Sequence, residues 1–336
     1  MTRSLVIAPQ WIGDAVMSQP LLAALAARAE TLTVAALPWV APVYRAMPEV
    51  GEVIELPFAH GRLDWGRRRA VARTLRGRYE RAYVLPNSLK SALIPWLAGI
   101  PKRIGYAGES RVILLNERLP NPPGRPPMVA FYGALGGLPP VADPQAQPRP
   151  RLAFDARVID AACASVDARR GDYWAFAPGA EYGPAKCWPP EHYAQLARSL
   201  FDKHGLPVLL LGSGKELPLC EQIAQHAPGA CRVLAGKTSL LDAMALIAGS
   251  RGVVSNDSGL MHVAAAFGIP QVAVFGSTSP EHTPPLNPRA AVIWLKDELQ
   301  LDCAPCFDRV CRFGHTRCLT GVSAERVEAA MAAALA

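Results

Sequence analysis

Charged and hydroxyl side chains recur where an apolar, strand-like run of this chain gives way to a helix-like run. In GVVSNDSGLMHVAAAFG, Asp257, Ser258 and Gly259 lie at the start of a predicted helix, and His262 follows one turn later. Unpaired backbone N–H groups and the helix dipole make such an N-terminus a favourable place for a phosphate. An ordinary helix cap by Asp257 or Ser258 has the same composition. This segment therefore predicts either a phosphate site or a simple cap.

A lysine occupies a comparable place in APGAEYGPAKCWPPEHYAQL. A strand-like run leads through a loop to Lys186 and Trp188, and a helix is predicted from Pro189 or Pro190. Because ligands of open α/β sheets bind at the carboxyl ends of the strands, Lys186 is well placed to neutralise a diphosphate. A solvated loop lysine is the alternative. The Gly-x-Gly of LLLGSGKE lacks the third glycine of a dinucleotide fingerprint, so it is weak evidence for NAD.

Two junctions in the first half carry groups suited to a sugar. In LVIAPQWIGDAVMSQPLL, Asp14 follows a strand-like run and Gly13, and it opens a predicted helix. A carboxylate at this position could take the proton of an attacking hydroxyl as a general base, or it could cap the helix. In RAYVLPNSLKSAL, the side chains of Asn87, Ser88 and Lys90 suit a sugar hydroxyl or an anion.

These junctions belong to an alternation of strands and helices that occurs in both halves of the chain. In the first half we expect strands at 4–8, 31–37, 52–56 and 81–85, and helices at 15–28, 65–77 and 88–99. In the second half we expect strand ends within 173–179, 207–214, 231–236, 252–257 and 271–277. Strands that alternate with helices at this spacing indicate parallel, doubly wound sheets.

A proline-rich stretch separates the two halves. Residues 120–150 contain ten of the 32 prolines, around a short predicted helix in MVAFYGALGGL. Proline withholds a backbone donor, so we interpret this stretch as a linker or hinge. A chain of 336 residues also exceeds the size at which one core usually stops growing. We therefore expect two α/β domains with a ligand cleft between them.

The basic residues are concentrated in the first half. The net charge is +7, and residues 1–150 hold 18 Lys and Arg against 10 Asp and Glu. Much of the excess lies in GRLDWGRRRAVARTLRGRYER (61–81). Such a segment suits an anionic partner, namely a membrane surface, a phosphorylated glycolipid or nucleic acid, but a solvated helix face explains it equally well. No run of 18 uncharged apolar residues and no secretory signal is evident, so we expect a cytoplasmic protein.

Four of the eight cysteines gather near the end of the chain. They are Cys303, Cys306, Cys311 and Cys318, and His315 adds a further potential ligand. Their spacings of two, four and six residues depart from paired Cys-x2-Cys zinc knuckles. We therefore favour reduced thiols that pack an irregular loop over structural zinc, and we expect no metal cofactor.

Five segments of the chain resemble, in order, those of the lipopolysaccharide heptosyltransferase II family of glycosyltransferase family 9: PQWIGDAVMSQPLL, LPNSLKSAL, PGAEYGPAKCWP, SNDSGLMHVAAA and CAPCF…CRFGHTRCL. The match spans roughly residues 4–322, and five motifs in order are far more specific than one. The related heptosyltransferase I has a different sequence at LPNSLKSAL and lacks the terminal cysteines. The resemblance implies a GT-B fold, in which two Rossmann-like domains face each other across a cleft.

The resemblance also implies a domain plan and substrates. Residues 1–150 would bind the acceptor, heptosyl-Kdo2-lipid A, and residues 151–322 the donor, ADP-L-glycero-β-D-manno-heptose. The C-terminal helix, 323–336, would pack back on the first domain. The enzyme would contact the cytoplasmic face of the inner membrane peripherally and would not bind nucleic acid. A basic first half is consistent with a phosphorylated glycolipid as the acceptor.

Residue roles follow from the same resemblance. Asp14 would deprotonate the acceptor hydroxyl for an inverting transfer, and Lys186 would bind the departing phosphates in place of a metal ion. Acceptor contacts would come from Gly13, Asn87, Ser88 and Lys90. Donor contacts would come from Glu181, Tyr182, Lys186, Asp257, Ser258, Gly259 and His262. A carboxylate such as Glu181 does not suit a phosphate directly, so its role stays open.

Three rival functions are compatible with part of this pattern. A transferase that uses another nucleotide sugar or acceptor would share the fold and the site. An NAD-dependent oxidoreductase is disfavoured because no complete G-x-G-x-x-G follows the first strand. A nucleic-acid-binding protein could use the arginines of 61–81, but no recognition motif accompanies them. The sequence leaves open which acceptor hydroxyl reacts, whether the acceptor must be phosphorylated, and the oligomeric state.

Overall fold

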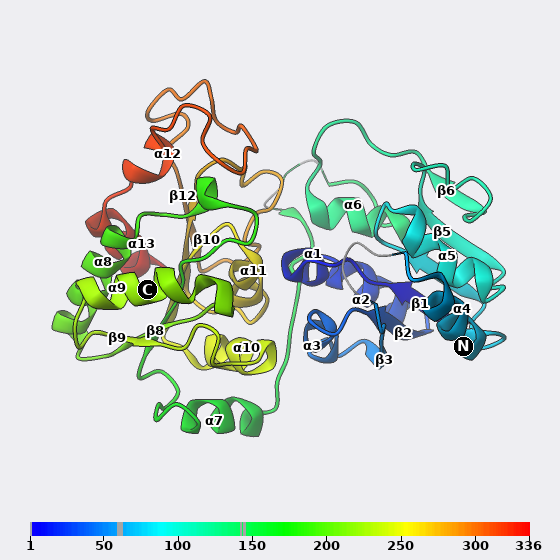
Figure 1. Ribbon diagram of the computed structural model, residues 1–336, viewed down its shortest axis with the longest axis horizontal. Helices are drawn as coiled ribbons and strands as arrows, with labels where there is room; N and C mark the ends of the chain where they lie inside the picture. Colours follow the sequence, from blue (N-terminus) through cyan, green and yellow to red (C-terminus); the bar gives the residue numbers. More distant parts are fainter. Residues whose placement is uncertain (1, 59–62, 142, 144–145) are drawn as a thin grey trace. The chain divides into compact units, whose positions relative to one another are not determined.

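The computed structural model describes residues 2–58, 63–141, 143 and 146–336, and they form two compact units. Unit 1 comprises Met1–Ala153 and unit 2 comprises Phe154–Ala336 (Figure 1). The division falls three residues beyond the boundary expected at residue 150. Two units, each with its own sheet, confirm the α/β fold class and the repeated strand–helix alternation.

Unit 1 is built on a six-stranded parallel sheet. In chain order the strands are β1 (Thr2–Ile7), β2 (Glu30–Ala36), β3 (Val50–Glu55), β4 (Arg81–Val84), β5 (Lys102–Tyr106) and β6 (Glu117–Leu119). In space the order is β3-β2-β1-β4-β5-β6, and all pairs are parallel. This is the Rossmann order, and the strand order reverses between β1 and β4. Ligands of such sheets bind at the carboxyl ends of the two strands at this switch point.

Two groups of helices accompany this sheet. The helices of unit 1 are α1 (Ile12–Met17), α2 (Gln19–Ala27), α3 (Ala41–Arg45), α4 (Trp65–Leu75), α5 (Leu89–Leu97) and α6 (Met128–Leu135). Helices α4 and α5 contact each other, and their apolar side chains share a core cluster with β1 and β4. The second group consists of α1, α2, α3 and α6. Helix α1 contacts the other three, and α2 also contacts α6. Because both faces of a parallel sheet are covered, its central strands bury apolar residues on both faces, as Leu5, Val6 and Ile7 do in β1.

Unit 2 repeats the same plan. Its strands are β7 (Trp174–Ala177), β8 (Val208–Leu210), β9 (Cys231–Val233), β10 (Gly252–Asn256), β11 (Gln271–Phe275) and β12 (Ala290–Trp294). The spatial order β12-β11-β10-β7-β8-β9 is again a Rossmann order, with all pairs parallel and the switch point between β7 and β10. The α-helices are α7 (Ala156–Ala164), α8 (Pro190–His204), α9 (Leu217–His226), α10 (Leu240–Gly249), α11 (Gly259–Ala266), α12 (Arg317–Thr320) and α13 (Ala324–Leu335).

The C-terminal helix is part of unit 2. We expected it to pack back on the first domain, but α13 packs against α8, β11 and β12. Val327 and Met331 on its apolar face are buried in the core of unit 2. On the same helix, Glu328 accepts hydrogen bonds from Ser199 Oγ at 2.9 Å and Lys203 Nζ at 2.6 Å, both on α8. Both its apolar and its polar contacts thus bind the helix to its own unit.

Two further details differ from the sequence-based expectation. The helix expected at 15–28 is two helices, α1 and α2, which meet at Ser18. The short helix expected inside the proline-rich stretch exists as α6, but it packs on α1 and α2 of unit 1 instead of lying in a free hinge. Within the described part of the chain, no helix is long and apolar enough to cross a membrane.

Candidate active site

The switch point of unit 2 brings together two residues that the sequence analysis selected. Lys186 ends a short 3-10 helix (Pro184–Lys186) after β7, and Asp257 directly follows β10, the neighbouring strand. Lys186 Nζ lies 2.5 Å from Asp257 Oδ2 and 3.1 Å from the backbone oxygen of Asp257. The exposed fractions of the two side chains are 13% and 4%. The lysine is therefore not a solvated loop residue but half of a buried ion pair.

Two threonines complete the contacts of the Asp257 carboxylate. Thr278 Oγ1 donates to Oδ2 at 2.7 Å, and Thr283 Oγ1 donates to Oδ1 at 3.3 Å. Neither threonine was selected from the sequence. Their signal was nevertheless available, because both follow β11, the strand beside β10, at the same carboxyl edge of the sheet. The carboxylate is thus held by three side chains from two segments and does not cap a helix.

Ser258 occupies the N-cap position of α11 without acting as a cap. No side-chain hydrogen bond closes this helix end, and the buried Ser258 Oγ has no hydrogen-bond partner among the described residues. The simple cap that we kept as an alternative is therefore wrong for both Asp257 and Ser258. A buried hydroxyl without a partner is costly, and such groups concentrate at functional sites. Together with the first N–H groups of α11, which begins at Gly259, it suits an anionic oxygen.

His262 lies one turn into α11 and is buried. Burial lowers the pKa of His262 from 6.5 to about 4, which outweighs the opposing effect of Asp257. At neutral pH the imidazole is therefore uncharged. It can exchange hydrogen bonds with a ligand, but it adds no positive charge for a diphosphate, which leaves that task to Lys186 and the helix N-terminus.

This buried histidine predicts a pH dependence of stability. Between pH 6.5 and about 4 the unfolded chain binds a proton at His262 that the folded protein does not, so the free energy of unfolding falls as the pH is lowered. The expected slope from this group is about 1.4 kcal/mol per pH unit in that window, with no contribution above pH 6.5. Urea unfolding at pH 5 and pH 7.5 would measure it. His262→Gln should remove this part of the pH dependence of the unfolding free energy, whereas His226→Gln on the surface should not. Equal pH dependence in the wild type and both variants would show that His262 is not its source.

Asn256 fixes the loop that carries Lys186. The side chain is fully buried, and its Oδ1 accepts from Trp188 N at 2.9 Å and from Tyr193 OH at 3.2 Å. Its Nδ2 donates to the backbone oxygen of Pro178 at 2.6 Å. One amide thus joins the end of β10 to both ends of the 178–188 loop. Sequence reasoning did not select it, because an asparagine at a strand end gives no sign of its partners.

Glu181 and Tyr182 lie on the outer part of this loop. Glu181 pairs with Lys215 Nζ at 2.6 Å on the surface. Tyr182 OH donates to the backbone oxygen of Phe307, and its ring centroid lies 5.3 Å from Lys186 Nζ and 5.5 Å from the Arg309 guanidinium. Glu181 is therefore a surface partner of a lysine, while Tyr182 packs beside the predicted phosphate-binding cation.

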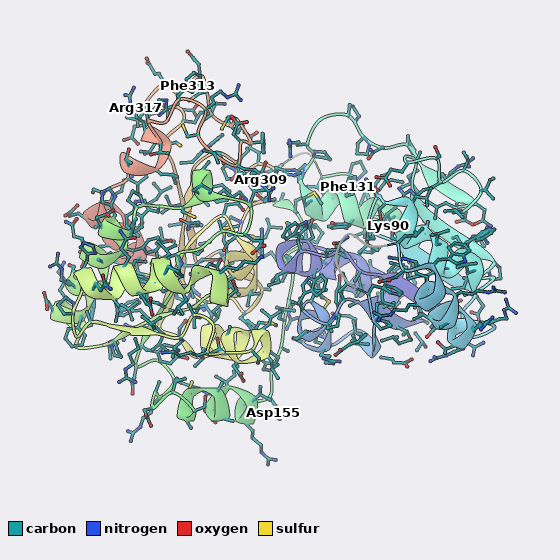
Figure 2. The ribbon with its side chains drawn as sticks, in the orientation of Figure 1. Lys90, Phe131, Asp155, Arg309, Phe313 and Arg317 are labelled. Atoms are coloured by element: carbon teal, nitrogen blue, oxygen red, sulfur yellow. The ribbon has the colours of Figure 1, made fainter. Side chains whose placement is uncertain are left out.

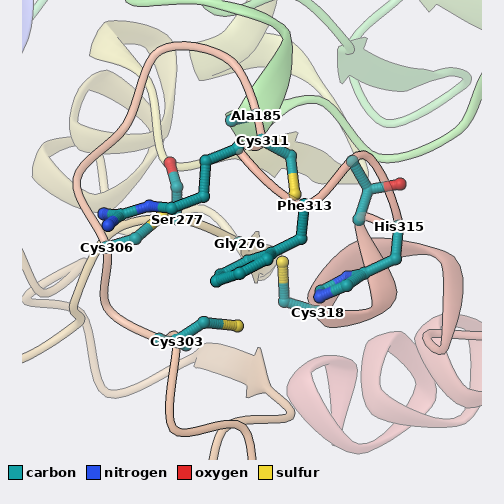
Figure 3. Close-up of a pocket in the computed structure, with 12 residues that line it drawn as sticks. Ala185, Gly276, Ser277, Cys303, Cys306, Cys311, Phe313, His315 and Cys318 are labelled. Atoms are coloured by element: carbon teal, nitrogen blue, oxygen red, sulfur yellow. The ribbon is translucent and has the colours of Figure 1, made fainter.

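The loop that contains Cys303, Cys306 and Cys311 packs against the Lys186 loop and against the segment that follows β11. Ala185 N donates to the Arg309 backbone oxygen at 3.1 Å, and Phe307 N donates to the Ser277 backbone oxygen at 2.7 Å. All eight cysteines of the chain are unpaired. A small cavity in this loop is lined in part by Cys303, Cys306, Cys311, Phe313, His315 and Cys318 (Figure 3).

The thiols around this cavity are not alike. Burial raises the pKa of the Cys318 thiol to about 11. Backbone N–H groups, that of Thr316 foremost, lower the pKa of the Cys311 thiol. Phe313 is an exposed residue of this loop, and Arg317 begins α12 directly after it (Figure 2). Among the residues that the structure describes, no three His, Cys, Asp or Glu side chains are grouped so that they could hold a metal ion.

The switch point of unit 1 carries Asp14 on the side of β1. Asp14 is the third residue of α1, whose N-cap is Trp11, so it is not the helix cap that we had kept as an alternative. Tyr132 OH, from α6, donates to Asp14 Oδ1 at 2.8 Å. Burial raises the pKa of Tyr132 well above its usual value, and the Asp14 charge raises it further, so the phenol stays a donor. Sequence reasoning did not select Tyr132, which lies 118 residues from Asp14.

The other side of this switch point holds the predicted acceptor residues. Asn87 Oδ1 accepts from Arg111 at 3.2 Å, and Ser88 is the N-cap of α5, where its hydroxyl accepts from Ser91 N. Lys90 lies in the first turn of α5 (Figure 2). Gly13 immediately precedes Asp14 in α1. Because β1 and β4 are neighbours, Asp14 and the 87–90 segment follow adjacent strands at the same edge of the sheet.

Comparison with known proteins places the chain in a family. A model of glycosyltransferase family 9, described as heptosyltransferase, matches residues 68–317. Lipopolysaccharide heptosyltransferase 2 of Escherichia coli K12 is 45% identical over 308 residues, which cover 87% of this chain and 88% of that protein. Lipooligosaccharide heptosyltransferase 2 of Haemophilus influenzae is 42% identical over 307 residues, with the same coverage. The solved structure of E. coli ADP-heptose LPS heptosyltransferase II matches with a TM-score of 0.84 and 39% identity, over 99% of this chain and 98% of that one.

Two doubly wound units, each with its polar residues at the switch point, together with these matches define a glycosyltransferase of the GT-B type. The family resemblance inferred from the five sequence motifs is confirmed. Since the family model covers most of the chain, the chain belongs to glycosyltransferase family 9, the heptosyltransferases.

Proposed function

We propose that this enzyme transfers L-glycero-D-manno-heptose from ADP-heptose to the first heptose of heptosyl-Kdo2-lipid A, a step in assembly of the lipopolysaccharide inner core. The names of its relatives support this choice of substrates. The observation that carries the proposal is the pair of switch-point sites: a carboxylate in unit 1 and a buried lysine at a helix N-terminus in unit 2. An inverting glycosyl transfer needs a base for the acceptor and charge stabilisation for the leaving group.

Unit 2 is the donor-binding domain in this proposal. The diphosphate of ADP-heptose binds between Lys186 Nζ, Ser258 Oγ and the first N–H groups of α11. Because Asp257 holds Lys186, the ammonium is fixed before the donor arrives, which favours the charge that develops on the leaving phosphate. Neutral His262 contributes a hydrogen bond to the donor. These groups take the place of a metal ion.

Unit 1 is the acceptor-binding domain. Gly13, Asn87, Ser88 and Lys90 surround the acceptor sugar, and Asp14 takes the proton of its attacking hydroxyl. The acceptor oxygen forms a bond to the anomeric carbon as the bond from that carbon to the ADP oxygen breaks, and the electron pair leaves with ADP. Tyr132 OH donates to Asp14 Oδ1 and thereby helps to orient the carboxylate.

The test is ADP release from ADP-heptose by the purified enzyme, with and without heptosyl-Kdo2-lipid A. We expect acceptor-dependent release, one added heptose by mass spectrometry, and an unchanged rate in excess EDTA. Kdo2-lipid A without heptose is the matched control acceptor, and UDP- and GDP-sugars are the control donors. Turnover of Kdo2-lipid A or of another nucleotide sugar in preference to these substrates would contradict the proposal, and a rate abolished by EDTA would contradict metal independence.

A further inference from the structure

The side chains around the proposed diphosphate site carry little net positive charge. The buried Asp257 carboxylate compensates the Lys186 ammonium, and Glu181 compensates Lys215 at the surface. His262 is uncharged at neutral pH, because burial lowers its pKa to about 4. A nucleoside diphosphate is negative on each of its phosphate groups, so a further cation beside these residues would strengthen its binding.

Arg309 is a cation beside the same site whose charge is not compensated. It lies in the loop of residues 303–316 that precedes α12 (Figure 2). Its Nε donates to the Tyr182 backbone oxygen at 2.8 Å, and its guanidinium lies 5.5 Å from the centroid of the Tyr182 ring. In the described part of the chain this is its one side-chain hydrogen bond, and it has no carboxylate partner. Lys186 Nζ lies 5.3 Å from the centroid of the same ring, so one aromatic ring contacts both cations.

Backbone hydrogen bonds fix the position of this loop next to Lys186. The Arg309 backbone oxygen accepts from Ala185 N at 3.1 Å, and Phe307 N donates to the Ser277 backbone oxygen at 2.7 Å. Ser277 N in turn donates to the Ala185 backbone oxygen at 3.2 Å. The loop, the segment that carries Lys186 and the segment after β11 are therefore joined through their main chains, and the backbone at Arg309 is held in place.

Gly183 makes this close approach of the two segments feasible. A Cβ atom at this position would lie 2.5 Å from the Arg309 backbone oxygen, which is closer than real contacts allow. Its φ of 152° is also one that residues with a side chain rarely adopt. The contact between the 303–316 loop and the lysine segment thus depends on a glycine at position 183.

We propose that Arg309 is a second cation for the diphosphate of the donor, and that the loop of residues 303–316 positions it beside Lys186. Its terminal amino groups bind a phosphate oxygen while Nε stays bonded to the Tyr182 backbone oxygen. Arginine suits this task because its N–H donors lie in one plane and match the oxygens of a phosphate. The inference rests on the proposed function, in which unit 2 binds a nucleotide sugar, and it gives the loop that contains Cys303, Cys306 and Cys311 a role in that binding.

Calorimetric titration of the full-length enzyme with ADP tests the proposal, and adenosine is titrated in competition with ADP. Arg309→Gln should weaken ADP binding about tenfold, the effect of one charge-assisted hydrogen bond, and should leave adenosine binding unchanged. The loss should shrink at high salt, because a charge–charge interaction is screened, whereas a displaced loop would lower the affinity equally at all salt concentrations. Arg309→Lys keeps the charge without the planar donors, so its loss should be smaller, about threefold.

The control variant is Arg312→Gln. Arg312 is an exposed arginine of the same loop, and Asp308 already pairs with it at 2.7 Å. The control should therefore bind ADP within about twofold of the wild type. Equal losses in Arg309→Gln and Arg312→Gln, or wild-type ADP affinity in Arg309→Gln, would overturn the proposal. Equal losses for ADP and adenosine would show that Arg309 supports only the structure of the site.

The outcome is separable from the proposed reaction. Binding of ADP that depends on Arg309, without transfer to heptosyl-Kdo2-lipid A, would keep this contact and reject the acceptor. Tighter binding of UDP or GDP than of ADP, again weakened in Arg309→Gln, would keep the diphosphate contact and reject the donor. Heptosyl transfer by Arg309→Gln with an unchanged KM for ADP-heptose would reject the contact and keep the proposed function. A KM raised only for the acceptor would reject the diphosphate contact as well, and would assign Arg309 to the acceptor.

Discussion

Replacement of Asp14 by Asn should lower kcat by about a thousandfold, within the range that a general base contributes. The amide has the same shape and can still accept the hydrogen bond from Tyr132, so the position of the side chain should be kept. What is lost is the ability to take a proton from the acceptor hydroxyl. The KM for ADP-heptose should change little, because the proposed donor groups belong to unit 2. Initial rates of ADP release at saturating acceptor measure both constants.

Two further variants serve as a control and as a test of the hydrogen bond to Asp14. Asp155→Asn, at the N-cap of α7 in unit 2, should retain the wild-type kcat, because Asn and Asp cap helices equally well. Tyr132→Phe keeps the Asp14 carboxylate but removes its hydrogen bond, so we expect a smaller loss, of roughly tenfold. If Asp14→Asn retains kcat within a factor of about three while Tyr132→Phe does not, Asp14 is not the base.

The fold was predictable where strands are central and apolar. Strand β1, with Leu5 and Val6, and strand β10, with Val253 and Val254, are buried on both faces, and their apolar runs were recognised in the sequence. Strands β5, β6 and β12 lie towards the sheet edges and were missed. Strand β5 begins with Lys and Arg, and β6 has only three residues, so neither produces an apolar run. Strand β12, Ala290–Trp294, is apolar throughout, so a short apolar run alone did not identify it as a strand.

The candidate site was predictable to the extent that it depends on local order. Asp14, Lys186 and Asp257 each follow a strand, and the carboxyl edge of a parallel sheet is visible in the sequence as a strand-to-helix junction. The pairing of Lys186 with Asp257 was not predictable, because 71 residues separate them and the strand order decides that they meet. The same holds for Tyr132, which reaches Asp14 through the packing of α6 on α1.

The position of α13 shows that the sequence pattern of a helix does not identify the domain on which it packs. Its apolar residues predicted an amphipathic helix correctly, but they do not say which core it covers. The resemblance to GT-B proteins suggested the first domain. The ion pair and hydrogen bond of Glu328 with α8 and the burial of Val327 and Met331 decide for unit 2. An amphipathic pattern predicts that a face is buried, and only tertiary contacts identify the partner.

Replacement of Lys186 by Met should affect stability and activity separately. Loss of one partner from a buried ion pair leaves an uncompensated carboxylate at Asp257, which typically costs about 3–5 kcal/mol of unfolding free energy. Thr278 and Thr283 still donate to that carboxylate, so we expect the lower end of this range. In the proposed mechanism the same replacement removes the cation that meets the leaving diphosphate. We therefore expect kcat/KM for ADP-heptose to fall about a thousandfold, as measured by ADP release.

The double variant Lys186→Met, Asp257→Asn separates these two roles. The amide introduced at position 257 would keep hydrogen-bonding capacity without charge, so urea unfolding should return to within about 1 kcal/mol of the wild type. The double variant also removes the negative charge of Asp257, which would repel the diphosphate. Activity and ADP affinity should nevertheless stay low, because the Lys186 cation that would bind the diphosphate is missing. If the double variant instead regains kcat/KM along with stability, Lys186 serves only to neutralise Asp257. The diphosphate would then be bound by the N-terminus of α11 and Ser258 alone.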